Sequence, residues 1–298
     1  MWRGVMAGSL RDMSPRVALV TDSTAMLPRE VADGRGIVVV PLQVIVGATS
    51  YDEGADPDAS PERIAAALRE KTPVSTSRPS PTAFAEVYER AAAAGAESVL
   101  SVHLSSGVSG TFESAQLAAR DASLPVQVVD TRQLGYATGY AVLSAADVAD
   151  RGGSLEDAAD AAASRAAAST SLFYVDTVEY LRRGGRIDAA AALLGSALSV
   201  KPLLTVADGR ISMKEKVRTS GRALGRLEQL AVEAAGDGTV DVAVAHLSAV
   251  DRAETLAARL CTRLVDQLDG TDVTVGEVGA VIGAHVGPGM VAVVVAPR

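Results

Sequence analysis

Seven residues between a predicted strand and a predicted helix combine hydroxyls with glycines. They run from Ser105 to Thr111, directly after an apolar stretch that ends at Leu104. The first N–H groups of a helix lack partners within the helix and lie at the positive end of its dipole, while Gly107 and Gly110 allow a ligand oxygen to approach the backbone. The loop therefore predicts an anion site or an ordinary serine cap. Its spacing matches neither a Walker A phosphate loop nor a nucleophile elbow.

Three further segments carry groups that could bind an anion. The stretch Thr76–Pro81 places hydroxyls before a helix, Arg182–Arg186 holds three guanidinium groups around two glycines, and His285 lies in the glycine-rich stretch Gly283–Gly289. Guanidinium groups bind carboxylates or phosphates through paired hydrogen bonds. Taken alone, each segment is also consistent with a structural loop, such as a helix cap, a solvated helix end or a satisfied core histidine.

Metal binding is not indicated by the sequence. The three histidines, His103, His246 and His285, are far apart and lack the spacings typical of zinc ligands. Cys261 has no partner cysteine, so one chain builds neither a disulfide nor a cysteine-based zinc site. We expect Cys261 to be a small buried hydrophobe.

Composition and charge exclude several classes of protein. Hydrophobic residues make up 48% of the 298 residues and charged residues 21%, a balance that supports a buried core and excludes general disorder. The net charge of −8 repels nucleic acid on average. Residues 1–15 lack the apolar core of a signal peptide, and Val278–Ala296 would make a poor membrane span because it contains His285 and Pro288 among glycines. We therefore expect a cytoplasmic protein with no nucleic-acid partner and no stable membrane insertion.

Strand-like and helical segments alternate in the first half of the chain, which predicts an α/β unit with a mostly parallel, Rossmann-like sheet. The expected strands are Val17–Thr24, Ile37–Val46, Ser98–Leu104 and Val126–Asp130, and the expected helices are Pro61–Lys71, Pro81–Ala94 and Ser114–Ala122. The alanine-rich stretch from Gly135 to about Ala168 predicts paired helices and a passage between domains.

The second half predicts an α+β domain with an antiparallel sheet. The expected strands are Ser171–Asp176, Lys201–Val206, Arg210–Val217, Asp241–His246, Val273–Val278 and Met290–Ala296. Asp208 and Gly209 mark a tight hairpin, and an amphipathic helix from Asp251 to Leu268 covers the sheet. We therefore expect two domains, residues 16–168 and 169–298, after a poorly ordered extension at 1–15.

In this order, the segments resemble the DegV family of bacterial fatty-acid-binding proteins over about Val17 to Ala296. The resemblance rests on Val20–Thr24, Val40–Val44, Thr76–Ser80, Ser105–Thr111, Leu181–Ile187, Val200–Leu204, Lys216–Thr219 and the His285 segment. It implies two α/β domains with a fatty acid held between them and its alkyl chain buried. Aliphatic side chains such as those of Ala189–Val200 could line that tunnel or form a plain core helix.

The resemblance also implies roles for individual residues. Thr76 and Ser109 would bind the carboxyl group, and the surrounding groups would be Ser77, the backbone of Gly110, His285 and the positive charge of Arg186. Better-studied members present the bound acid to a separate ATP-dependent fatty acid kinase, which makes an acyl phosphate. The resemblance thus implies a carrier subunit without catalytic residues, cofactor or metal.

Two residues depart from the family pattern near the expected head-group site. Val286 stands where the family often has threonine, which removes a hydroxyl, and Arg78 stands where it often has glutamine, which adds a positive charge. Both bear on the identity of the ligand and on pairing with a kinase more than on the fold.

Two other function classes remain open from the residues alone. In a serine-dependent acyl hydrolase or transferase, Ser109 or Ser106 would be the nucleophile and His285 or His103 the base. In an anion-binding regulator, the Arg182–Arg186 segment would hold a phosphate or phosphosugar.

Overall fold

The computed structural model describes residues 17–187 and 200–298. The extension at 1–15 and the expected tunnel segment at 189–199 lie outside the described residues. In the described part, no helix is long and apolar enough to cross a membrane. No group of three or more metal-binding side chains there could hold a metal ion.

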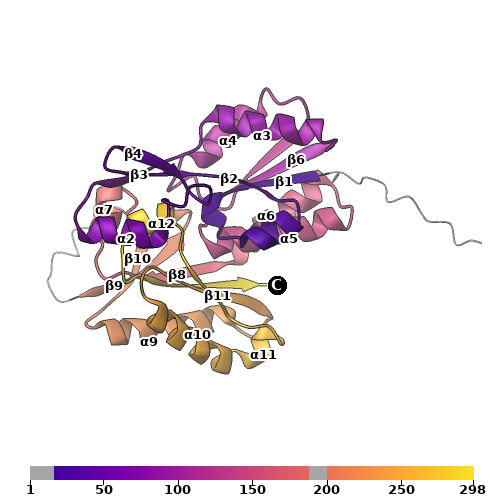
Figure 1. Cartoon of the computed structure of the whole chain (residues 1–298). Helices are drawn as coiled ribbons and strands as arrows, with labels where there is room; N and C mark the ends of the chain where they lie inside the picture. Colours follow the sequence, from indigo (N-terminus) through magenta and orange to yellow (C-terminus); the bar gives the residue numbers. More distant parts are fainter. Residues whose placement is uncertain (1–16, 188–199) are drawn as a thin grey trace, which may run out of the picture.

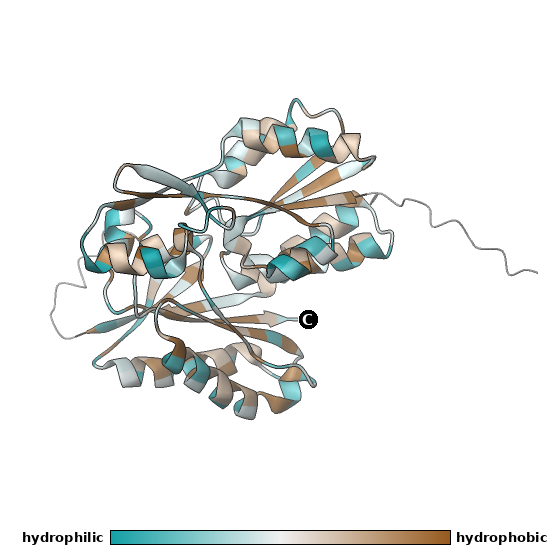
Figure 2. Cartoon of the chain, in the orientation of Figure 1, coloured by the Kyte–Doolittle hydropathy of each residue, from teal (hydrophilic) through white to brown (hydrophobic). Residues whose placement is uncertain are grey.

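The first sheet is parallel and has the order β2-β1-β6-β7. Its strands are β1 (Val17–Asp22), β2 (Val38–Val40), β6 (Ser98–His103) and β7 (Val126–Asp130). Helices α3 (Pro81–Ala93) and α4 (Thr111–Ala119) cover one face, and α5 (Tyr136–Asp150) and α6 (Leu155–Ala168) cover the other (Figure 1). The two central strands, β1 and β6, are buried along their whole length, and Figure 2 shows their apolar residues in brown. This arrangement confirms the predicted Rossmann-like unit. A short helix, α1 (Arg29–Gly34), joins β1 to β2.

A small antiparallel sheet interrupts this unit and was not predicted. It has the order β4-β3-β5, with β3 at Gln43–Val46, β4 at Thr49–Asp52 and β5 at Val74–Ser77, and α2 (Pro61–Arg69) lies between β4 and β5 in the chain. The single strand expected over Ile37–Val46 was wrong, because Pro41 lacks the N–H needed to continue a ladder and the chain changes sheets there. Thr76 and Ser77 consequently lie in a strand rather than in a loop before a helix.

The second half forms a six-stranded sheet with the order β10-β9-β8-β13-β11-β12. The strands are β8 (Thr170–Tyr174), β9 (Lys201–Ala207), β10 (Arg210–Val217), β11 (Val240–His246), β12 (Thr274–Glu277) and β13 (Val291–Pro297). All neighbours are antiparallel except β11 and β12, which confirms the predicted antiparallel component. Asp208 and Gly209 both have positive φ, as a tight hairpin between β9 and β10 requires.

Two helices cover the outer face of this sheet, α9 (Ser220–Ala235) and α10 (Val250–Arg263). The expected single helix over Asp251–Leu268 is broken at Leu264 into α10 and a short α11 (Val265–Leu268). Cys261 packs against this core but is only partly buried, so the expectation of a buried cysteine was too strong. The division of the chain at residue 168, between α6 and β8, remains a proposal.

The inner face of the six-stranded sheet turns toward the first unit. Leu172 and Tyr174 of β8 face α9, whereas Phe173 belongs to a different apolar cluster on the inner side. Two short helices also pack on that side, α7 (Glu179–Gly184) and α12 (Ala280–Val286). His285 lies within α12, so its predicted place in a glycine-rich loop was wrong. Gly283 lies inside the helix against Leu247, whereas Gly279 precedes the helix and Gly287 ends it with φ of 75°.

A buried carboxylate organises the loops at the carboxyl edge of the parallel sheet. Asp22, at the end of β1, accepts hydrogen bonds from the backbone N–H and hydroxyl of Thr24 and from the backbone N–H of Leu104. Its Oδ2 atom lies 2.9 Å from Nδ1 of His103, and neither side chain has exposed surface. The other ring nitrogen of His103 bonds to the hydroxyl of Ser101 at 2.7 Å.

We expect the substitution Asp22→Ala to lower the free energy of unfolding by about 3–5 kcal/mol, because it leaves several buried donors without an acceptor. Urea unfolding followed by circular dichroism measures this loss. The control is Asp33→Ala on α1, which removes only an exposed ion pair with Arg29 and should change stability by less than about 0.5 kcal/mol. Equal losses in the two variants would contradict the role given to Asp22.

Candidate fatty acid site

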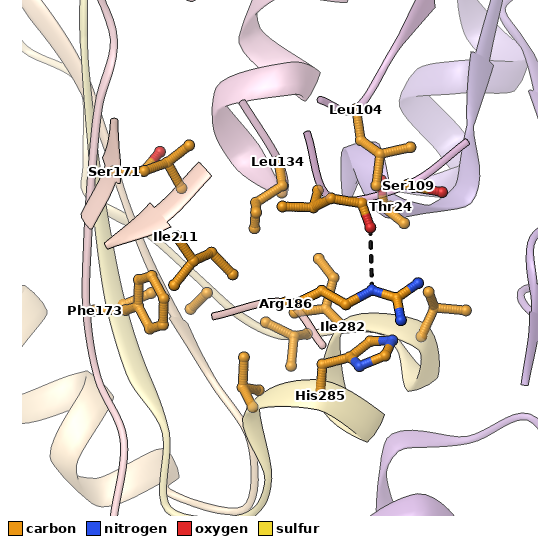
Figure 3. Close-up of a pocket in the computed structure, with 18 of the residues that line it drawn as sticks. Thr24, Leu104, Ser109, Leu134, Ser171, Phe173, Arg186, Ile211, Ile282 and His285 are labelled. Atoms are coloured by element: carbon orange, nitrogen blue, oxygen red, sulfur yellow. Dashed lines mark hydrogen bonds between the residues drawn. The ribbon is translucent and has the colours of Figure 1, made fainter. Parts of the chain in front are cut away.

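A cavity of about 340 Å³ lies between the parallel sheet and the inner face of the six-stranded sheet. Most of its wall is apolar, and the side chains that form it include Leu104, Leu134, Phe173, Ile211 and Ile282 (Figure 3). Ser109, Arg186 and His285 lie together at one end, whereas the hydroxyl of Ser171, at the other side, donates to Gln133. The cavity is thus apolar over most of its length and polar at one end.

Thr76 and His285 meet across this polar end. The Oγ1 atom of Thr76, on β5, lies 2.9 Å from Nε2 of His285, on α12. The imidazole ring packs directly on Gly184, where a Cβ atom would fall 2.3 Å from Nδ1. Burial, and to a smaller extent the positive charge of Arg186, lowers the pKa of His285 to about 4. His285 is therefore a neutral hydrogen-bonding group at physiological pH.

Ser109 and Gly110 reach the same end from the loop that leads into α4. Gly110 is the N-cap residue, and the hydroxyl of Ser109 is 2.9 Å from that of Thr111. The backbone N–H groups of the first turn of α4 point out of the helix start, so an anion there is favoured by the helix dipole. Ser77 also lines the cavity, so β5 supplies two hydroxyl residues and α4 a third.

Arg186 is the half-buried cation of the polar end. Its Nε donates to the carbonyl of Val108 at 3.1 Å, and its Nη1 donates to the carbonyl of Gly184. Burial lowers the pKa of Arg186, which shows that its charge is incompletely solvated. All six residues predicted for the site, Thr76, Ser77, Ser109, Gly110, Arg186 and His285, line one cavity.

The arginine cluster expected from the sequence divides into two parts. Arg182 and Arg183 are exposed and both bond to Glu179 of their own helix, while Arg186 turns into the cavity. The three guanidinium groups therefore do not converge on one anion. This arrangement removes the geometric basis for an anion-binding regulator that uses Arg182–Arg186.

The model of the DegV family, described as an uncharacterised protein family, matches residues 16–298. The chain belongs to the DegV family. It is 51% identical over 287 residues to a DegV domain-containing protein of Streptomyces coelicolor, covering 96% of this chain and 100% of that protein. It is 35% identical over 284 residues to a DegV domain-containing protein of Halalkalibacterium halodurans, covering 93% of this chain and 96% of that one.

Two solved structures of the family have the same fold. A fatty-acid-binding DegV family protein from Thermus thermophilus is 34% identical, with a TM-score of 0.84 and coverage of 95% of this chain and 100% of that chain. DegV of Bacillus subtilis, described as a fatty acid binding protein, is 30% identical, with a TM-score of 0.86 and coverage of 95% and 99%. The predicted family and the predicted α/β fold class are both confirmed.

Arg78 and Thr24 of this DegV chain are polar residues that line the cavity but were not assigned to the site from the sequence. The guanidinium of Arg78 lies against Gly110, where a Cβ atom would fall 1.8 Å from Nη1, and it donates no hydrogen bond to any described residue. Thr24, held by Asp22, contributes to the wall beside Leu104. The departure of Arg78 from the family pattern could have assigned it to the site, whereas no local sequence feature indicates that Thr24 belongs there.

The serine residues of this DegV protein do not form a nucleophile and base pair. Within the described residues, Ser109 bonds to Thr111 and Ser106 bonds to Asp130, and neither hydroxyl bonds to a histidine. The arrangement of Ser101, His103 and Asp22 resembles a catalytic triad in its connections. All three side chains are fully buried, so a substrate does not reach them.

The lowered pKa of His285 predicts a pH dependence of stability. The unfolded chain takes up the proton near pH 6.5 and the folded chain only near pH 4, so stability present above pH 6.5 is lost as pH falls toward 4. The 2.5-unit difference corresponds to about 3 kcal/mol at the acid end. We expect His285→Gln to flatten the stability curve over this window in urea titrations.

The comparison between wild type and His285→Gln isolates the contribution of His285 to the pH dependence of stability. Glu53 has a pKa raised by burial, which acts in the opposite direction, but it is present in both proteins. Parallel stability curves between pH 4 and pH 6.5 would contradict the buried, neutral state of His285.

Proposed function

We propose that this protein binds a long-chain fatty acid in the cavity between the two sheets and presents its carboxyl group to a separate ATP-dependent kinase that forms an acyl phosphate. The observation that carries the proposal is a mostly apolar cavity in which Thr76, Ser109, Arg186 and His285 gather at one end. That distribution matches an amphipathic ligand with one head group and one apolar tail. The chain would act in the cytoplasm, as a carrier and not as a catalyst.

The head group would be held by hydrogen bonds and by nearby positive charge. Thr76, Ser109 and neutral His285 supply short-range contacts, and Ser77 and the backbone of Gly110 complete the surroundings. Arg186 contributes a cation whose Nε and Nη1 are already bonded to carbonyl groups. Hydrogen bonds to an ionised group are stronger than those between neutral groups, so few are needed to orient the carboxylate.

The acyl chain would supply most of the binding free energy. Each methylene that leaves water contributes about 0.8 kcal/mol, so a long chain contributes on the order of 10 kcal/mol before entropy costs. Phe173 and Ile211 are buried in the wall on the inner face of the six-stranded sheet. The apolar wall requires no specific polar contact along the tail.

The polar end lies toward solvent, as presentation to a kinase requires. Arg78 is exposed and Ser77 is only partly buried, while Phe173, Val206 and Val294 at the apolar wall are buried. A partner enzyme would therefore meet the carboxyl end of the ligand first. The structures from Thermus thermophilus and Bacillus subtilis are described as fatty acid binding, which supports the ligand class by family relationship.

Native mass spectrometry of the purified protein, followed by organic extraction, tests the proposed ligand. We expect about one fatty acid per chain, either copurified or taken up from a panel of saturated and unsaturated acids. Binding should occur without turnover, so we expect the extracted acid to be chemically unchanged. A protein that stays empty after incubation with the whole panel would contradict the proposal.

The head-group assignment predicts the effect of a double substitution. We expect Thr76→Val with Ser109→Ala to weaken fatty acid binding at least about tenfold, because two hydrogen bonds to a charged carboxylate are lost. Titration of a fluorescent fatty acid measures the change. The control is Ser75→Ala, the neighbouring residue on β5, which is exposed and absent from the cavity wall. Unchanged affinity in the double variant would refute these contacts.

A further inference from the structure

The fatty acid cavity and a second hollow share two wall residues. Met26 and Tyr136 line the cavity of about 340 Å³ and also a surface groove of about 930 Å³. The groove's other apolar wall residues include Leu27, Val39 and Val275. The side chains of Met26 and Tyr136 are therefore a partition between the acyl site and the groove.

Met26 is held at the partition by its backbone and by a glycine. It follows the 3-10 helix Ser23–Ala25 with φ of 54°, a left-handed conformation, and Asp22 caps the start of that helix. Its sulfur packs over Gly135, at 3.5 Å from where a Cβ atom would stand. A methionine side chain is unbranched and has three rotatable bonds, so it moves aside at lower cost than a branched residue.

Tyr136 forms the other half of the partition. Its hydroxyl lies directly on Gly276 of β12, where a Cβ atom would fall 2.2 Å away, and its ring stacks on Tyr140 with centroids 6.4 Å apart. Burial raises the pKa of Tyr136. The position is fixed by packing on both sides, so Met26 is the more mobile member.

The partition lies at the opposite side of the sheet from the cation of the polar end. Arg186 precedes Ile187, which bridges to Ile211 on the edge strand β10, whereas Tyr136 rests on the other edge strand, β12. The two wall residues and Arg186 therefore lie over different strands of the sheet. A ligand with its carboxyl group near Arg186 can extend along the inner face of the sheet toward Met26.

The groove offers apolar surface next to the partition. Val38 and Val39 belong to β2, an edge strand of the parallel sheet, and Val275 belongs to β12. These three valines are 40%, 38% and 38% exposed, although the groove also carries acidic residues such as Glu53 and Glu277.

The enclosed cavity is small for a long acyl chain, since ligand sites span about 300–1,000 Å³ and this one lies near the lower limit. We propose that Met26 sets the acyl-chain length that the enclosed cavity holds, and that longer chains displace it and pass beside Tyr136 into the groove. This inference rests on the proposed fatty acid function and adds the residue that determines specificity for the tail.

Competition titrations with saturated acids of increasing length, from 12 to 22 carbons, test the proposal on wild type, Met26→Ala and Met26→Leu. We expect Met26→Ala to bind the 20- and 22-carbon acids at least about fourfold more tightly relative to the 14-carbon acid, the gain from one further buried methylene. Met26→Leu, which keeps the bulk, should retain the wild-type profile within twofold. Val265→Ala on α11, an exposed residue outside both hollows, serves as a second control and should keep the wild-type profile.

Photolabelling of the wild-type protein tests the path without any substitution. Acids of 12 and 22 carbons that carry a diazirine on the last carbon are bound, irradiated and located by peptide mass spectrometry. We expect the short acid to label interior positions such as Phe173 and the long acid to label β2 or β12.

The outcomes separate the two claims. If wild type binds fatty acids but Met26→Ala keeps the wild-type length profile, or if both acids label only the interior, the role of Met26 is wrong and the proposed function stands. If the long acids bind neither wild type nor Met26→Ala while shorter acids bind, the passage into the groove is likewise wrong. If no acid of any length binds, the proposed function fails and this inference fails with it.

Discussion

The buried carboxylate of Asp22 is the contact on which the geometry of the site depends. It accepts hydrogen bonds from Thr24 and from the backbone of Leu104, and it pairs with His103 in an environment without solvent. The loop that follows Leu104 carries Ser109, and the short helix that begins after Asp22 ends at Met26. One acidic side chain thereby fixes both the head-group loop and the residue at the proposed tail end. Since burying a carboxylate is costly unless it is fully hydrogen-bonded, these loops have little freedom to move independently.

The polar end and the apolar wall of the cavity make different kinds of interaction. At the polar end, the groups satisfy one another in pairs: Thr76 with His285, Ser109 with Thr111, and Arg186 with backbone carbonyls. Under the proposed function, a carboxylate that enters would exchange these contacts for charge-assisted ones, which favours binding without requiring a buried, unpaired charge in the empty protein. Along the wall, apolar side chains from both sheets contribute in proportion to the area they cover, so affinity is set mainly by the tail and orientation by the head group.

Local sequence patterns did not predict several of the elements that build the site. Pro41 splits one apolar run into β2 and β3, which belong to different sheets, and β5 pairs with β3 although about 30 residues separate them in the chain. The apolar residues around His285 and the flanking glycines are consistent with a loop, but packing on α2 and α7 makes that segment a helix. Short segments of this kind carry too little periodicity to be assigned without knowing what they pack against.

The sequence by itself determined the alternation of strands and helices, the hairpin at Asp208 and Gly209, and the family, because each depends on local residue types and their order. The six residues assigned to the site followed from the resemblance to that family. Only the tertiary structure decided which of these residues meet. Arg186 separates from Arg182 and Arg183 because a neighbouring Glu179 binds the latter two, and Arg78 becomes part of the wall because Gly110 leaves room for it. The wall shared by Met26 and Tyr136 depends on contacts with Gly135 and Gly276, and Gly276 lies 140 residues beyond Tyr136 in the chain. Contacts between such distant residues arise from packing of whole sheets, for which a single sequence carries no local signal.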